Sequence, residues 1–104
     1  MSSDLARWET IRDGVLRLVV RGDLDLSVID RLTATMWTRA PGSVPQVEID
    51  LGGVGFFDTS VARTLERYRV EASAHDADVR VVVASAVPLM VLRLTGLREL
   101  LGAG

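Results

Sequence analysis

Residues 54–61 read Val-Gly-Phe-Phe-Asp-Thr-Ser-Val, and within them the chain changes its pattern of apolar residues. Residues 46–51 alternate polar and apolar side chains, which is typical of a strand with one buried face. From about residue 60 to residue 74, apolar residues recur at helical spacing. The Asp-Thr-Ser at 58–60 supplies residue types that cap a helix N-terminus. The sequence therefore predicts a strand, a turn made by glycines, and an amphipathic helix.

Three further segments have the composition of strands, namely residues 8–11, 15–20 and 79–84. The first two are joined by Asp13-Gly14, a good hairpin turn because glycine adopts a positive φ at little cost. Residues 79–84 are almost continuously apolar and β-branched, which predicts a strand covered on both faces.

Two more helices are predicted on either side of these segments. Residues 28–37 carry apolar side chains at helical spacing, and Ser27 precedes them as a cap. A third helical segment follows Pro88, and a final helical turn ends the chain. We expect Met36 and Met90 to lie in the core. Because strands alternate with helices, the fold class is α/β with parallel crossover connections.

Composition limits the kind of protein further. The 104 residues are 48% apolar and 25% charged, which suits a single domain over residues 1–104. The net charge of −2 argues against nucleic-acid binding, and no apolar run approaches the roughly 20 residues of a membrane span. Without cysteine and with one histidine, His75, no metal site or cofactor is expected. The N-terminus lacks a signal-peptide pattern, so we expect a cytoplasmic protein without membrane insertion.

The hydroxyl groups at residues 59 and 60 allow two interpretations. The residues could simply cap the helix, or one hydroxyl could carry a phosphate, since a helix N-terminus favours negative charge. An enzyme is not indicated. Asp58-Thr59-Ser60 is followed by a helix, unlike the Asp-Thr-Gly of the mostly β aspartic proteases, and Ser60 has no plausible base. We therefore expect no catalytic residues.

A second polar cluster lies at residues 21–25, between a strand and the first helix. It could be an ordinary turn. Alternatively, Leu24 would be an apolar knob between the carboxylates of Asp23 and Asp25, on a loop suited to a basic partner surface.

The whole chain resembles the STAS domain family, which includes anti-sigma factor antagonists. The resemblance rests on four ordered landmarks: Gly22-Asp23-Leu24-Asp25, residues 47–56, Asp58-Thr59-Ser60, and Leu94-Thr95-Gly96-Leu97. It implies a four-to-five-stranded mixed sheet covered on one side by about four helices. It also implies a non-catalytic switch that sequesters an anti-sigma factor with serine/threonine kinase activity and releases it when phosphorylated, a phosphatase restoring the first state.

Matched residue by residue, the resemblance implies that Thr59 is the phosphate acceptor, with Ser60 beside it. Asp58 would fix the loop. The partner-binding surface would consist of Asp23, Leu24, Asp25, Asp58, Thr59, Ser60 and Val61.

Two departures from the family pattern bear on this function: Thr59 supports an alternative, and Val61 would narrow the close approach that a kinase active site needs. Simple antagonists usually have serine where this chain has Thr59, and a small residue where it has Val61. A threonine at this position resembles the members that form stressosomes or serve lipid transporters. The alternative is therefore a non-switching STAS interaction subunit of a stressosome-like or transporter complex.

Overall fold

Four strands form one sheet in residues 5–102, the part of the chain that this computed structural model describes. In sheet order they are β1 (Ala6–Arg12), β2 (Val15–Leu24), β3 (Gln46–Phe57) and β4 (Asp78–Ala84). β1 and β2 are antiparallel, whereas β2 with β3 and β3 with β4 are parallel. The predicted turn between β1 and β2 is confirmed, with Gly14 at φ +77°. The sheet is therefore mixed, as expected.

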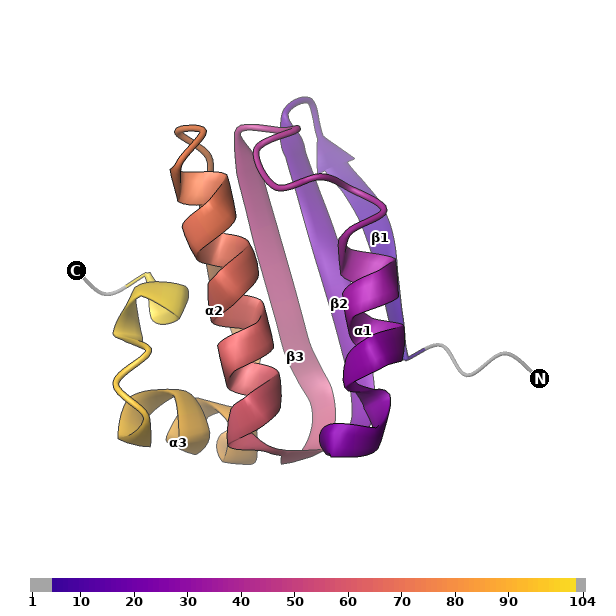
Figure 1. Cartoon of the computed structure of the whole chain (residues 1–104), viewed down its shortest axis with the longest axis vertical. Coiled ribbons are helices and arrows are strands. Elements are labelled where there is room, and N and C mark those ends of the chain that lie inside the picture. The colour runs from indigo at the N-terminus through magenta and orange to yellow at the C-terminus, as the bar shows by residue number, and fades with distance from the viewer. Residues whose placement is uncertain (1–4, 103–104) are drawn as a thin grey trace.

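Helices follow three of the four strands and lie over one face of the sheet (Figure 1). They are η1 (Leu26–Val28), α1 (Ile29–Met36), α2 (Thr59–Ser73), α3 (Ala86–Leu94) and η2 (Arg98–Leu101), where η denotes a 3-10 helix. This arrangement confirms the α/β fold class and the single covered face of the sheet that were expected from the sequence.

The core lies between the sheet and the helices. Leu18 of β2, Ile49 of β3 and Leu65 of α2 are fully buried there. Tyr68 of α2 is also buried, and its hydroxyl donates a hydrogen bond to the Arg39 carbonyl at 2.6 Å. Burial of these apolar side chains is the main favourable contribution to folding. It fixes α2, and with it the segment before α2, against the sheet.

The opposite face of the sheet is open to water, which corrects one expectation. β4 was predicted to be covered on both faces, but Val82 and Val83 are exposed. The reason is that the helices pack on one side only. On the open face, Arg17 pairs with Glu48 of the neighbouring strand at 2.7 Å, a cross-strand contact of opposite charges.

Two strands are longer than the sequence predicts. β3 does not turn at Gly52, Gly53 and Gly55 but continues through them to Phe57. None of these three glycines has a positive φ, and Gly53 is paired with β2. β2 likewise continues to Leu24. Pairing with the adjacent strand satisfies the backbone groups, and this outweighs the low strand propensity of glycine.

Three details of the helices also differ. The first helical segment is capped by Asp25, not by Ser27. α3 begins before Pro88, which is tolerated because its missing N–H falls in the first turn, where no helical partner exists. Met36 is buried as predicted, but Met90 is 52% exposed, because it lies on the side of α3 that faces away from the core.

Candidate functional site

The two polar clusters singled out in the sequence meet at the carboxyl ends of β2 and β3. Leu24 at the end of β2 is in register with Phe57 at the end of β3. Directly after them, the Asp58 N–H donates to the Leu24 carbonyl at 2.9 Å. Because the strands are parallel, residues 23–25 and residues 58–60 emerge at the same edge of the sheet. The chain thus brings together two segments that lie more than thirty residues apart.

Asp58 organises the start of α2. Its backbone is extended, and its carboxylate accepts hydrogen bonds from the Ser60 N–H and the Ser60 hydroxyl, both at 2.8 Å. These bonds lower the pKa of Asp58 below its ordinary value, since they favour the charged form. Asp58 is therefore an ionised helix cap at neutral pH, and the loop is held as the sequence predicts.

Thr59 and Ser60 differ in accessibility. Thr59 is the first residue of α2 and is exposed, and its hydroxyl has no hydrogen-bond partner within residues 5–102. Ser60 is half-buried, and its hydroxyl is held by Asp58. Free backbone N–H groups at a helix N-terminus favour added negative charge. Of the two candidate acceptors, the Thr59 hydroxyl is the one that another molecule can reach.

Asp23 and Asp25 place two further carboxylates beside Asp58. Asp25 caps η1 by accepting from the Ser27 N–H at 2.9 Å. Hydrogen bonds from Ser27 lower the pKa of Asp25, and the negative charge of Asp58 opposes them only in part. Asp23 accepts from the Phe56 N–H at 3.1 Å. The edge of the sheet is therefore an acidic surface, which we call the strand-end surface: Asp23, Asp25, Asp58 and Thr59.

Gly55 of β3 lies close to the Asp23 carboxylate. A Cβ added to Gly55 would lie 2.8 Å from Asp23 Oδ1, closer than such atoms approach in proteins. This close approach lets the Asp23 carboxylate reach the backbone of β3. The glycine predicted to turn the chain thus leaves room for the Asp23 carboxylate to accept from the Phe56 N–H.

Two of the residues predicted to bind a partner are fully buried. Leu24 is not a knob on a loop, because β2 includes it and its side chain enters the core opposite Phe57. Val61 faces the core from the first turn of α2. Both residues support the surface from beneath. The departure from the family pattern at Val61 therefore leaves the outer side of the helix start unobstructed.

The exposed apolar residues of this edge are Leu26 and Phe56, which the sequence analysis missed. Leu26 is 68% exposed and directly follows Asp25, and Phe56 is 49% exposed and is hydrogen-bonded to Asp23 through its N–H. An exposed aromatic and an exposed leucine on one edge make that edge a candidate protein-binding surface, since aromatic residues are enriched at interfaces. The alternation of inward and outward side chains along a strand could have identified Phe56, because it points Phe57 into the core and Phe56 outwards.

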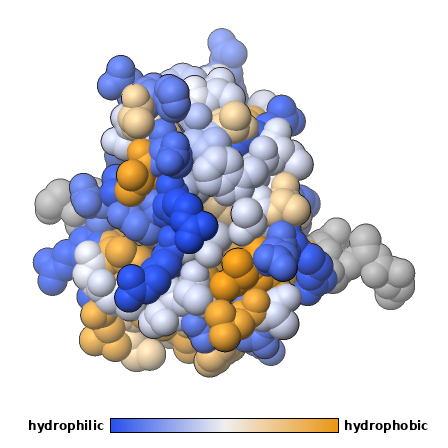
Figure 2. All heavy atoms as spheres, in the orientation of Figure 1, coloured by the Kyte–Doolittle hydropathy of each residue, from blue (hydrophilic) through white to orange (hydrophobic). Residues whose placement is uncertain are grey.

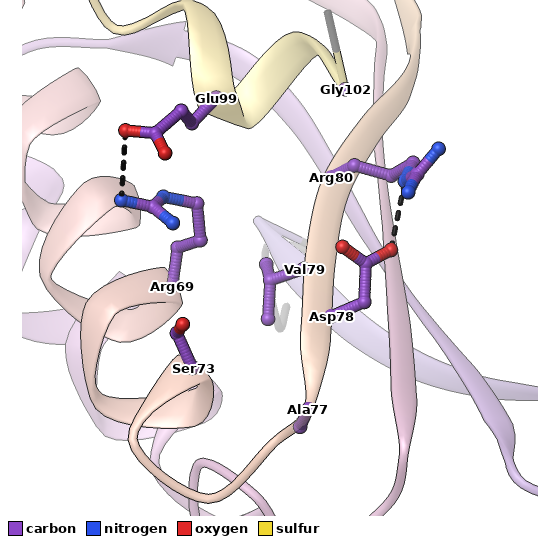
Figure 3. Close-up of a pocket in the computed structure, with 8 residues that line it drawn as sticks. All are labelled: Arg69, Ser73, Ala77, Asp78, Val79, Arg80, Glu99 and Gly102. Carbon is purple, nitrogen blue, oxygen red and sulfur yellow. Dashed lines mark hydrogen bonds and ion pairs between the residues drawn. The ribbon is translucent and has the colours of Figure 1, made fainter. Parts of the chain in front are cut away.

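A separate hollow of about 210 Å³ lies between the C-terminal half of α2, the start of β4 and η2 (Figure 3). Its charged side chains are already paired: Arg69 contacts Glu99 at 3.5 Å, and Arg80 contacts Asp78 at 2.8 Å. These pairs leave no free charge for a ligand. Elsewhere in residues 5–102, no group of three or more His, Asp or Glu side chains is placed to hold a metal ion. None of the described helices is long and apolar enough to cross a bilayer.

The chain matches one protein family by sequence and several solved structures by fold. A family model described as "Mlab, STAS domain" matches residues 9–102. The fold is similar to the anti-sigma factor antagonist SpoIIAA in its unphosphorylated form, with a TM-score of 0.74 and 18% identity over 92% of this chain and 84% of that chain. For an anti-sigma factor antagonist from Mycobacterium paratuberculosis the TM-score is 0.80, with 22% identity over 97% of this chain and 87% of that chain. For the phosphorylated form of the Bacillus protein SpoIIAA the TM-score is 0.67, with 19% identity over 92% of this chain and 87% of that chain. No curated protein sequence matches the chain.

Proposed function

Because this chain belongs to the STAS domain family, we propose that it is an anti-sigma factor antagonist switched by phosphorylation. Without phosphate, the strand-end surface binds an anti-sigma factor that is also a serine/threonine kinase. Phosphorylation of Thr59 releases that partner, and a phosphatase reverses the change. The proposal places the protein in the cytoplasm and assigns it no catalytic activity of its own.

One observation carries this proposal: Thr59 offers an exposed, unbonded hydroxyl on a surface suited to protein binding. A phosphate there would carry up to two negative charges into a contact that already contains carboxylates. Asp58 and Ser60 are hydrogen-bonded to each other and not to Thr59, so modification would leave the helix cap intact. The fold would therefore persist while the docking surface changes.

The first experiment tests the acceptor. Each candidate anti-sigma factor kinase of the source organism is purified and incubated with the chain and ATP, and mass spectrometry locates the phosphate. We expect one phosphate on Thr59, its loss in Thr59→Ala, and its retention in Ser60→Ala. Phosphate located outside residues 59 and 60, or unaffected by Thr59→Ala, would contradict the site assignment.

The second experiment tests the switch. Thr59→Glu should weaken binding of the same partner by about 2 kcal/mol or more, roughly 30-fold, as expected when an unpaired charge enters an interface. Thr10→Glu is the matched control, because Thr10 is an exposed threonine on β1, away from the strand-end surface. A control that weakens binding equally would show a general charge effect.

A second candidate function is a permanent interaction subunit of a stressosome-like or transporter complex. Threonine at the acceptor position favours it. In that case Thr59 would lie outside the decisive contacts or would not be modified. Little change in affinity with Thr59→Glu, together with no phosphate transfer from any kinase, would select this candidate.

A further inference from the structure

α3 presents large apolar side chains to water. Met90 is 52% exposed and Leu94 is 79% exposed, and the two lie one turn apart on the same side of the helix. Figure 2 shows apolar surface at the lower left, where Figure 1 places α3. Grouped apolar side chains of this size on a surface indicate an interaction site.

A hollow of about 420 Å³ adjoins this stripe between α3 and η2. It is lined by Leu89, Arg93, Arg98 and Leu101. Neither arginine forms an ion pair within the described part of the chain. The acidic residue next to Arg98, Glu99, is directed to Arg69 instead. Two guanidinium groups are therefore available at the rim of an apolar groove.

We propose that α3 and η2 form a second docking surface, which binds an acidic amphipathic helix of a protein partner. The groove and the apolar stripe beside it suit the helix-in-groove mode of binding. In this mode, residues of the partner helix at i, i+3 or i+4 and i+7 enter a hydrophobic groove. The two arginines select carboxylates beside those residues, because guanidinium and carboxylate groups form strong charge-assisted hydrogen bonds. α3 has nine residues and is about 13 Å long, which suits two to three turns of a partner helix.

The chemistry of this groove is opposite to that of the strand-end surface. The strand-end surface exposes carboxylates and fits a basic partner, whereas the groove exposes arginines and fits an acidic one. The groove contains no residue of the proposed switch. The second surface therefore goes beyond the proposed function, and its test does not depend on Thr59.

The experiment measures binding of a synthetic probe to the full chain by fluorescence anisotropy. The probe is a fluorescein-labelled amphipathic helix of about 14 residues with leucines at i, i+3 and i+7 and flanking glutamates; a matched peptide carries lysines instead. We expect the glutamate peptide to bind at least about ten-fold more tightly. Arg93→Glu with Arg98→Glu should reverse this preference, and Leu94→Asp should weaken binding about ten-fold or more.

Matched controls lie on α2, where Arg67 and Val70 are exposed. Arg67→Glu and Val70→Asp should leave both peptide affinities unchanged. Equal binding of the two peptides, or equal loss in the controls, would overturn the proposal. The proposal would also be overturned if sedimentation equilibrium showed that the chain is a dimer and that Leu94→Asp dissociates it. The groove would then bind a second copy of the chain. Cosedimentation with phosphatidylglycerol vesicles without peptide preference would assign it to a membrane surface instead.

Discussion

Alkaline pH should destabilise this protein through a single side chain. Tyr68 is the only tyrosine, and the chain has neither cysteine nor lysine. All twelve basic residues are arginines, which stay charged until above pH 12. Between about pH 9 and pH 12, Tyr68 is therefore the only side chain expected to titrate.

The sign of the effect follows from the burial of the phenol. Burial raises the pKa of Tyr68 from 10 to about 12. As the pH rises above 10, the unfolded chain releases this proton before the folded one does, so the free energy of unfolding falls. The stabilisation is complete below pH 10 and is lost as the pH rises through about 12. The full difference corresponds to about 3 kcal/mol. Because the hydroxyl contacts the carbonyl of exposed Arg39, water screens part of it, and we expect about 1 to 2 kcal/mol.

Urea unfolding followed by circular dichroism at pH 9, 10, 11 and 12 measures this loss directly. Tyr68→Phe provides the control. At pH 9 it should cost about 1 kcal/mol, because the bond to the Arg39 carbonyl is lost. Its stability should then stay flat as the pH rises, so that the two curves converge near pH 12. A parallel decline in both proteins would refute the reasoning, because the titrating group would be another one.

Further predictions concern the strand-end surface and its support. Gly55→Ala should displace the exposed Asp23 carboxylate from the Phe56 N–H, because the new Cβ would meet Asp23 Oδ1 at 2.8 Å, and should change the free energy of unfolding by less than about 1 kcal/mol; unchanged hydrogen exchange at the Phe56 N–H would contradict this. Ser85→Ala should cost about 1 kcal/mol in urea unfolding, since its hydroxyl donates to two carbonyls of β3, and a neutral result would show that water replaces it. The pKa of Asp58 should lie below 3.8 in an NMR titration and rise part of the way towards that value in Ser60→Gly, which keeps the backbone N–H bond and loses the hydroxyl bond; no response would exclude the Ser60 hydroxyl as a cause.

Local features of the sequence were sufficient to predict the start of α2. Asp58, Thr59 and Ser60 follow a strand and precede a helical stripe, and a cap depends only on neighbours within one turn. The hairpin at Gly14 was predictable for the same reason. In both cases the interactions that decide the structure are made by residues adjacent in the chain.

The features that were predicted wrongly depend on distant neighbours. Whether Leu24 or Leu26 is exposed depends on where β2 ends, and β2 is extended by pairing with β3. Because strand side chains alternate between faces, this extension puts Leu24 inside, while Leu26 lies beyond the strand on the surface. The burial of Met90 was predicted wrongly for a related reason. α3 is apolar on nearly every side, so the spacing of its apolar residues does not reveal which side faces the sheet.

The direction of the proposed switch depends on where Thr59 lies within the docked complex. Two charges at about 4 Å interact by only about 1 kcal/mol in water, so at the rim a phosphate would attract a basic partner slightly. At the centre of the contact the phosphate must lose its water, which costs several kcal/mol per ion unless new partners replace it. Its neighbour in the chain, Asp58, is a carboxylate and cannot replace it. Release therefore requires a central position for Thr59, and binding tightened by Thr59→Glu at low salt would place it at the rim.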